Sequence, residues 1–281
     1  MIHQILDERC DGISGTWTGD DMKKLLAASV TGLALLSGSA LAADLPPAPQ
    51  VYKAPAVVAP VYNWTGCYID GGGGAGMWNQ SHYNYTTATG FINSFEQTTG
   101  GRGWYGEVGG GCDYQFSMGT FGNVVIGILG GYDFMDLKGA YSDSFNVVAT
   151  GYEKESNAGF VGGRIGFLVT PNLLTYTSGG WTESRFNGFT SISPVGAAFN
   201  FITPAHTYNG YFLGGGLEYS LAGWLGLPQG LFLRSDYRWS TFKAANINYL
   251  TTGGAPFGTS TRSNIYTMQL GTELIYRFNW Q

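Results

Sequence analysis

Charged residues are scarce in this chain of 281 amino acids, because Asp, Glu, Lys and Arg together make up only 12% of it. A soluble domain has about twice that share, since charged side chains cover much of its water-facing surface. The net charge of −5 also provides no basic field that would attract a nucleic acid. The composition argues against an ordinary soluble globular protein, and we expect no nucleic-acid partner.

Long apolar runs are also missing beyond residue 42, where apolar residues come in short stretches interrupted by glycine and polar positions. This excludes a membrane-spanning helix in that part of the chain, since such a helix needs about 20 consecutive apolar residues. Aromatic residues, in contrast, make up 15% of the chain, and there are 45 glycines. Few charges, many aromatics and no helical span together indicate strands that face lipid.

The N-terminus carries an export signal that starts inside the given sequence. Met22 and two lysines precede an apolar run over 25–36, and small residues follow up to Ala42. This order predicts a Sec-type signal peptide over 22–42, with cleavage after Ala42. Residues 1–21 are rich in acidic side chains, which is wrong for the start of a signal, so we interpret them as an upstream extension from a mis-assigned start codon.

Residues 43–62 contain five prolines among Ala, Val and Tyr. Such a segment cannot build a hydrogen-bonded ladder and favours extended polyproline geometry. We expect a periplasmic tether that acts as a plain spacer, with docking to peptidoglycan as the alternative.

From Asn63 to the C-terminus, residues 63–281 are predicted to form one β-barrel domain in the outer membrane. Eight stretches have the period of two and the length of a tilted membrane strand. Long connections at 78–102, 134–157, 183–209 and 242–264 alternate with short ones, as in bacterial barrels with short periplasmic turns and long external loops. The sequence therefore predicts an all-β fold, an eight-stranded antiparallel transmembrane β-barrel, with strands at 63–77, 103–115, 122–133, 158–168, 172–182, 210–221, 229–241 and 265–278.

Alternation alone does not distinguish a soluble barrel with an apolar interior from a membrane barrel with an apolar exterior. The signal peptide, the unequal connections and the aromatic residues near strand ends favour the membrane version. We expect these aromatics to form interfacial girdles; the tryptophans concerned are Trp64, Trp104, Trp181 and Trp239.

The membrane version places charged side chains inside the barrel. An eight-stranded barrel is just wide enough for side chains to fill it, and buried charges need partners of opposite sign. We therefore predict a closed, ion-paired lumen in preference to an open pore, with narrow conductance as the alternative. The predicted network has four cations and five anions: Glu107, Asp113, Arg164, Glu218, Arg234, Asp236, Arg238, Glu273 and Arg277.

The chain has three cysteines, without metal-ligand spacing or a Cys-x-x-Cys pair. Cys10 lies in the upstream extension. Cys67 and Cys112 fall at similar heights on the first two predicted strands and on the same face. A disulfide and two free thiols both fit this placement, since the periplasm permits disulfides.

Histidine is almost absent, and the two that follow the signal peptide, His82 and His206, fall in the first and third predicted external loops. With Tyr83 and Tyr85 nearby, a surface haem or metal site is one interpretation. An incidental placement is the alternative that we favour, and we expect no metal and no cofactor. Because no predicted strand contains a histidine, we also expect no hydrolase or acyltransferase site and hence no enzyme.

Three motifs of the chain stand out: Ala43-Asp44-Leu45-Pro46-Pro47, Tyr62-Asn63-Trp64-Thr65-Gly66-Cys67-Tyr68-Ile69 and Gly271-Thr272-Glu273-Leu274-Ile275-Tyr276-Arg277-Phe278. They resemble those of a known family, the small alphaproteobacterial outer-membrane surface antigens. These are also described as outer-membrane immunogenic or porin-family proteins, and they are related in architecture to the OmpA membrane domain. The chain departs from the family at Cys67, where an aromatic is common, and in extending beyond the final aromatic by three residues.

The resemblance implies a surface-exposed outer-membrane protein whose C-terminal aromatic is recognised by the barrel assembly machinery. It also implies haemin binding as an alternative, since some family members are described as binding haemin. We expect a structural role in envelope integrity, with weak porin-like activity left open. The alternative is a haemin-binding, small-ligand-binding or narrow-channel transport barrel. The expected partners are outer-membrane lipid and lipopolysaccharide, the assembly machinery and, through the tether, peptidoglycan.

Overall fold

The computed structural model describes residues 63–279, except 144–148, 223 and 225. The predicted upstream extension, signal peptide and tether lie outside the described residues, as do the last two residues of the chain. No helix in the described part is long and apolar enough to cross a membrane. Its helices are two 3-10 turns, η1 (Gly119–Phe121) and η2 (Ala197–Phe199).

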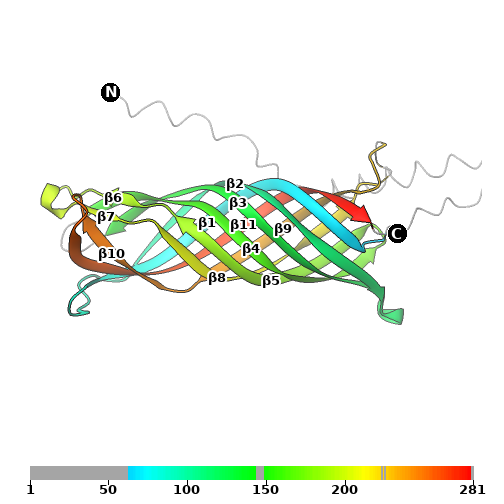
Figure 1. Cartoon of the computed structure of the whole chain (residues 1–281), viewed down its shortest axis with the longest axis horizontal. Coiled ribbons are helices and arrows are strands. Elements are labelled where there is room, and N and C mark those ends of the chain that lie inside the picture. The colour runs from blue at the N-terminus through cyan, green and yellow to red at the C-terminus, as the bar shows by residue number, and fades with distance from the viewer. Residues whose placement is uncertain (1–62, 144–148, 223, 225, 280–281) are drawn as a thin grey trace, which may run out of the picture. The chain divides into compact units, whose positions relative to one another are not determined.

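Eight strands close into an antiparallel ring in the order β1-β2-β3-β4-β5-β8-β9-β11, with β11 pairing back onto β1. Figure 1 shows them strongly tilted against the long axis. The predicted eight-stranded barrel is thus confirmed, and each predicted strand overlaps one strand of the ring. Their bounds are β1 Gly66–Thr86, β2 Gln97–Ser117, β3 Asn123–Asp143, β4 Ala149–Thr170, β5 Leu173–Phe186, β8 His206–Ser220, β9 Leu231–Phe242 and β11 Pro256–Asn279.

The two ends of the barrel differ in their connections. One end, here the short-turn end, has the brief links β2–β3, β4–β5 and β8–β9. The other, here the long-hairpin end, carries three additional strands, β6 (Phe189–Ser191), β7 (Phe201–Thr203) and β10 (Ala245–Thr251). They lie together at the left of Figure 1.

The long connections were predicted as loops, and this was wrong for most of their length. β6 continues β5, β7 leads into β8, and β10 continues β9, so the hairpins stay paired well past the predicted strand ends. We call this part of the barrel, beyond the predicted strand ends, the extension. Apolar side chains pack inside it and stabilise the pairing. The regular spacing of these apolar residues was not recognised in the sequence, because Gly, Ser and Thr residues, which are typical of loops, lie between them.

A continuous apolar band surrounds the part of the barrel nearer the short-turn end. Exposed outward side chains there include Ile69, Val108, Ile128 and Leu270. No outward-facing residue of the band is charged, as a lipid-facing surface requires. The band covers 69–77, 104–114, 126–134, 161–169, 173–181, 211–219, 231–239 and 268–278.

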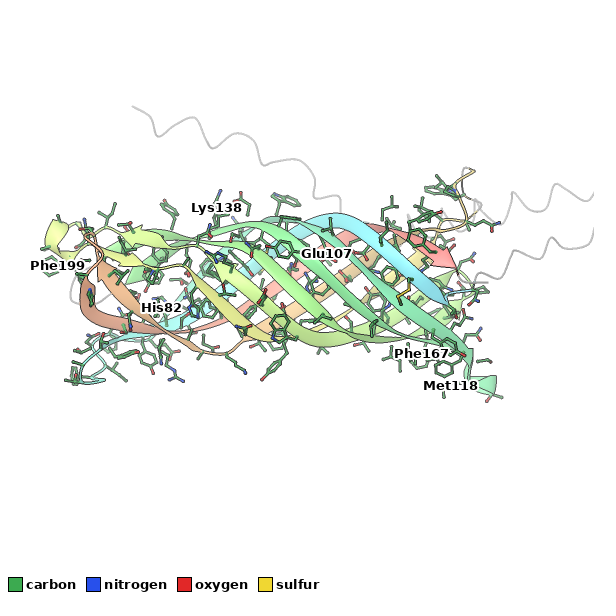
Figure 2. All side chains as sticks on the ribbon, in the orientation of Figure 1. His82, Glu107, Met118, Lys138, Phe167 and Phe199 are labelled. Carbon is green, nitrogen blue, oxygen red and sulfur yellow. A yellow bond between two sulfur atoms is a disulfide. The ribbon has the colours of Figure 1, made fainter. Side chains whose placement is uncertain are left out.

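Polarity reverses where the band ends. At the level of the band, the interior of the barrel is charged and its exterior is apolar. Nearer the long-hairpin end, outward positions such as Asp136 and Lys138 are charged and exposed, as Figure 2 shows for Lys138. The interior there holds large apolar side chains, and one cluster includes Trp78, Leu137 and Phe186. Buried polar side chains such as Gln80 and Glu155 lie among them. The barrel therefore has a lipid-facing part and an extension with the polarity of a soluble barrel.

The tryptophans follow this division only in part. Trp104, Trp181 and Trp239 are exposed on the outer wall at the limit of the band, where an interfacial girdle is expected. Trp64 was assigned to a girdle, and this was wrong. It is fully buried at the short-turn end, where its ring packs on Phe232.

Candidate functional site: the barrel lumen

Arg164 is the centre of the ion-pair network nearer the short-turn end. From β4, its Nε donates to Oδ1 of Asp113 on β2 at 2.9 Å, and Nη2 contacts the other oxygen of the same carboxylate. Its Nη1 donates to Oε2 of Glu218 on β8 at 3.0 Å. One guanidinium thus joins three strands through a bidentate and a single contact, which is the geometry that Arg provides and Lys does not.

Arg277 on β11 closes the network from the other side. Its Nη1 lies 2.6 Å from Oδ2 of Asp113, and its Nε donates to Oε1 of Glu218 at 3.0 Å. It also donates to the backbone oxygen of Trp64 at 3.3 Å. Two arginines and two carboxylates therefore form a closed, alternating ring, and all four side chains are buried.

Arg234 on β9 extends this network by one further pair. Its Nε lies 3.6 Å from Glu218, and its Nη1 lies 3.5 Å from Asp70 on β1. The whole cluster then holds three arginines and three carboxylates. Opposite charges in equal number are what burial of charge requires.

Tyr68 lies between these three arginines. The guanidinium carbons of Arg164 and Arg277 are each 4.8 Å from its ring centroid, and that of Arg234 is 5.1 Å away. These are cation–π distances. Neither Tyr68 nor Asp70 was predicted in the network, although both lie on the face of β1 opposite the outward Cys67 and could have been found by alternation.

Arg238 on β9 organises a second cluster in the middle of the lumen. It pairs with Asp133 on β3 and lies 3.4 Å from Oε2 of Glu107 on β2. Its Nε donates to Oε1 of Gln269 at 3.1 Å, and Gln269 in turn donates to Asp133 at 2.9 Å. The carbon of the guanidinium lies 3.8 Å from the ring centroid of Phe160. Asp133 was also missed, because it falls on the last residue of its predicted strand.

Two of the nine predicted network residues form no ion pair within the described part of the chain. Asp236 accepts a hydrogen bond from the Tyr176 hydroxyl at 3.1 Å and is half-buried. Glu273 is buried, and neither of its carboxyl oxygens has a hydrogen-bond partner in the described part of the chain. The other seven predicted residues take part in the ion pairs described above.

Little space remains between these side chains. A cavity bounded by Asp70, Glu107 and Arg234 has a volume of about 10 Å³, which is room for roughly one water molecule. Gly162 and Gly180 leave the space that the Phe212 ring fills, since a Cβ on either would meet that ring at 2.8 or 2.9 Å. The middle of the lumen is therefore filled.

Apolar layers close the lumen on both sides of the charged clusters. At the short-turn end, Trp64 and Phe232 pack with the buried residues Val125, Leu174 and Ile275. Toward the long-hairpin end, a larger apolar cluster follows, and a third lies beyond it around Tyr141, Phe201 and Tyr249. An ion crossing the barrel would have to displace all of these layers.

Glu153 and Glu155 are buried in the extension, beyond the apolar band. Glu155 accepts hydrogen bonds from Ser184 Oγ at 2.6 Å and Thr267 Oγ1 at 3.3 Å. Burial raises the pKa of Glu155 to about 7. Burial, reinforced by the nearby Glu155, raises the pKa of Glu153 to about 8. Both residues fall in the connection predicted as an external loop, so neither was predicted to be buried.

His82 and His206 were predicted in external loops, and this was wrong, because both lie on strands, β1 and β8. His82 is buried and stacks on Tyr141 with ring centroids 4.7 Å apart, and burial lowers its pKa to about 4. His206 contacts Tyr208 edge-on, and burial lowers its pKa as well.

The predicted haem or metal site gains no support from this placement. Tyr83 follows His82 on the strand and so points to the opposite face. The described residues contain no group of three or more His, Cys, Asp or Glu side chains that could hold a metal ion. The argument against an enzyme also loses its premise, since it assumed strands without histidine.

Cys67 and Cys112 are direct partners in the β1–β2 ladder and are joined by a disulfide. Of the two states left open by the sequence, the structure therefore has the bonded one. The bond lies on the outer wall toward the short-turn end.

Comparison with solved structures supports this architecture. No protein-family model matches the chain, and no curated protein matches it. Among solved structures, outer membrane protein OprG from Pseudomonas aeruginosa is similar, with a TM-score of 0.51 and 9% identity over 78% of this chain and 99% of that one. The outer membrane protease OmpT from Escherichia coli has a TM-score of 0.45 and 10% identity, over 76% and 97% of the two chains. At such identity, the likeness to OprG shows a shared fold and nothing finer.

Proposed function

We propose that this chain is an exported outer-membrane β-barrel that acts as a structural, surface-exposed component of a Gram-negative envelope. The observation that carries the proposal is the lumen, which is filled by paired arginines and carboxylates and closed by apolar layers at both ends. A diffusion pore needs a water-filled path, which larger barrels provide. A closed barrel is instead suited to a structural role, in which the protein is anchored in the outer membrane and its outer end is exposed at the cell surface.

The proposed orientation places the short-turn end in the periplasm and the long-hairpin end outside the cell. Short periplasmic turns and long external connections are the rule in such barrels. The predicted tether then lies in the periplasm, where peptidoglycan is its expected partner. Tyr276 and Phe278 face outward near the end of β11, where we expect the assembly machinery to recognise them.

The sequence resemblance supports the same proposal. It suggests membership of the surface-antigen family, in which a small barrel is displayed on the cell surface. The charged exterior of the extension suits an aqueous outer end, because Asp136 and Lys138 would be costly in lipid.

The proposal is tested by expressing the chain from Met22 in a Gram-negative host and measuring gel mobility of the outer-membrane fraction with and without boiling. We expect the protein in that fraction, with a mobility that changes on heating, because folded barrels resist detergent. A soluble periplasmic protein without a mobility change would contradict the proposal.

A pair of matched variants makes the test specific for lipid contact. Val108→Arg introduces a charge in the middle of the apolar band, whereas Tyr152→Arg introduces one on the exposed outer wall of the extension. A lipid-facing arginine costs about 2–4 kcal/mol at the bilayer midplane. We expect Val108→Arg to lower the heat-modifiable fraction and Tyr152→Arg to leave it unchanged, whereas a water-exposed barrel would tolerate both.

A further inference from the structure

Three basic side chains form a row across the outer wall, just beyond the apolar band. Arg102 on β2 is the direct ladder partner of Lys138 on β3, and Lys138 is the direct partner of Lys154 on β4. Directly paired residues have Cβ atoms about 5 Å apart. The three cations therefore lie side by side, and Figure 2 shows Lys138 projecting from the outer wall.

The row is only partly neutralised. Asp136 lies 3.0 Å from the Lys138 ammonium and 2.7 Å from that of Lys154. No ion pair to Arg102 is present among the described residues, so the carboxylate of Asp136 pairs with only two of the three cations. Like charges placed directly opposite one another in a sheet are destabilising, and an external anion would relieve that repulsion.

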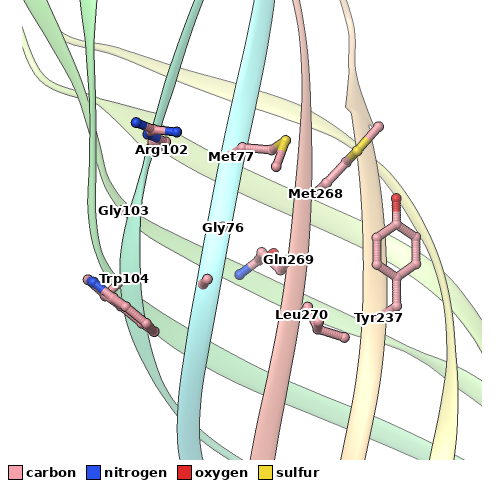
Figure 3. Close-up of a pocket in the computed structure, with 10 residues that line it drawn as sticks. Gly76, Met77, Arg102, Gly103, Trp104, Tyr237, Met268, Gln269 and Leu270 are labelled. Carbon is pink, nitrogen blue, oxygen red and sulfur yellow. The ribbon is translucent and has the colours of Figure 1, made fainter. Parts of the chain in front are cut away.

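An apolar groove starts at the same arginine and runs into the band. Figure 3 shows Trp104 on one side of it and Met268, Leu270 and Tyr237 on the other, with Arg102 above Trp104. The groove exists because β1 presents the small Ala75 between these large side chains. Its volume of about 700 Å³ is in the range of ligand sites.

We propose that the row and the groove together bind one phosphorylated lipid of the outer leaflet, of the lipid A type. Its phosphates would contact Arg102, Lys138 and Lys154, and one acyl chain would lie in the groove against Trp104. The inference rests on the proposed function, because it requires this wall to face a membrane.

The positive charge of the row and its level at the edge of the apolar band both favour this ligand. Arg and Lys bind phosphate oxygens through charge-assisted hydrogen bonds, Arg in a bidentate manner. Tryptophan marks the level of the headgroups, and Trp104 is two residues from Arg102, one step into the band. A soluble anion would use the cations without the groove, and a neutral lipid would use the groove without the cations.

The test is native mass spectrometry of the full chain in detergent, with diphosphoryl lipid A and with the same lipid after removal of both phosphates. We expect one diphosphoryl lipid per barrel and much weaker binding of the dephosphorylated form. The triple variant R102Q/K138Q/K154Q should bind the diphosphoryl lipid roughly a hundredfold more weakly, at about fivefold for each cation lost. Ala75→Trp, which fills the groove and leaves the charges in place, should also weaken binding.

The matched control is R262Q/K243Q, which removes two other exposed cations outside the row. It should bind as the unmodified chain does. Equal binding of both lipid forms, equal loss in the control, or a second copy of the chain in place of lipid would overturn the proposal. If the triple variant does not fold, two other measurements replace it: binding by R102Q alone, and binding by the unmodified chain at rising salt concentration. Both should show weaker binding of the diphosphoryl lipid, and unchanged binding in both would overturn the proposal.

Heat-dependent mobility of the same samples separates the two proposals. A barrel that shifts on heating but does not distinguish the lipids retains its proposed function and loses the lipid site. A chain that neither shifts nor reaches the outer membrane contradicts the proposed function itself.

Discussion

Arg238 and Asp133 pair across the full width of the barrel, from β9 and β3, which occupy opposite positions in the eight-stranded ring. They are 105 residues apart in the sequence. This contact forms only when the ring is closed, since neither strand is a neighbour of the other. The central ion pairs thus connect opposite walls, whereas the ladders connect adjacent ones.

Replacing Arg238 by Met should strongly destabilise the barrel, because Asp133 and Glu107 would lose the cation that they share. Removal of one partner from a buried pair costs about 3–5 kcal/mol in the free energy of unfolding. Urea unfolding in lipid vesicles, followed by tryptophan fluorescence, measures this loss. Arg262→Met, at an exposed position, should cost no more than about 0.5 kcal/mol, and similar losses in the two variants would refute the role of the central pair.

The disulfide should contribute to stability although it joins neighbouring strands. It closes a loop between residues 45 positions apart, and such a crosslink stabilises by about 2–4 kcal/mol, chiefly through the unfolded chain. C67S/C112S should therefore unfold at lower urea concentration than the oxidised protein. The reduced unmodified chain is the control, and it should resemble the variant. Two alkylatable thiols in the unreduced protein would contradict the bond.

The buried glutamates of the extension predict a loss of stability with rising pH. Burial raises the pKa of Glu155 to about 7 and that of Glu153 to about 8 in the folded chain, whereas an exposed Glu has a pKa near 4.3. The folded chain then holds these protons more tightly than the unfolded chain. The stabilisation is complete below the unfolded pKa and is lost as pH rises through the folded pKa values.

Between pH 6.5 and 8.5, the free energy of unfolding should therefore fall by on the order of 1 kcal/mol per pH unit. E153Q/E155Q should flatten this slope, and Glu183→Gln, on the outer wall, should leave it unchanged. His82 changes the stability in the opposite direction and at lower pH. Because burial lowers its pKa to about 4, its contribution to stability is lost as pH falls below about 6.5. An unchanged slope in the glutamine variant would refute this assignment.

The sequence predicted the barrel because its lipid-facing part alternates cleanly. On β11, for example, outward Leu270 and Leu274 alternate with inward Glu273 and Arg277. Seven of the nine predicted lumen residues take part in the observed ion pairs for the same reason. Which arginine pairs with which carboxylate could not be predicted, because the partners come from strands far apart in the sequence.

The extension could not be predicted by the same rule, because its polarity is reversed. Trp78, Leu137 and Phe186 face inward there, and charged side chains face outward. An assignment that assumes apolar residues outside places these positions on the wrong face or in loops. Trp64 was misplaced for a related reason, since an aromatic residue near a strand end fits a girdle and an inner plug equally well.

The closed lumen is the central claim, and conductance across a planar lipid bilayer tests it most directly. Protein whose heat-dependent mobility shows that it is folded is inserted and held under voltage in concentrated potassium chloride. The account predicts insertion without steady conductance, because ion pairs and apolar layers fill the path. Reproducible, voltage-independent conductance steps from the same protein would contradict it.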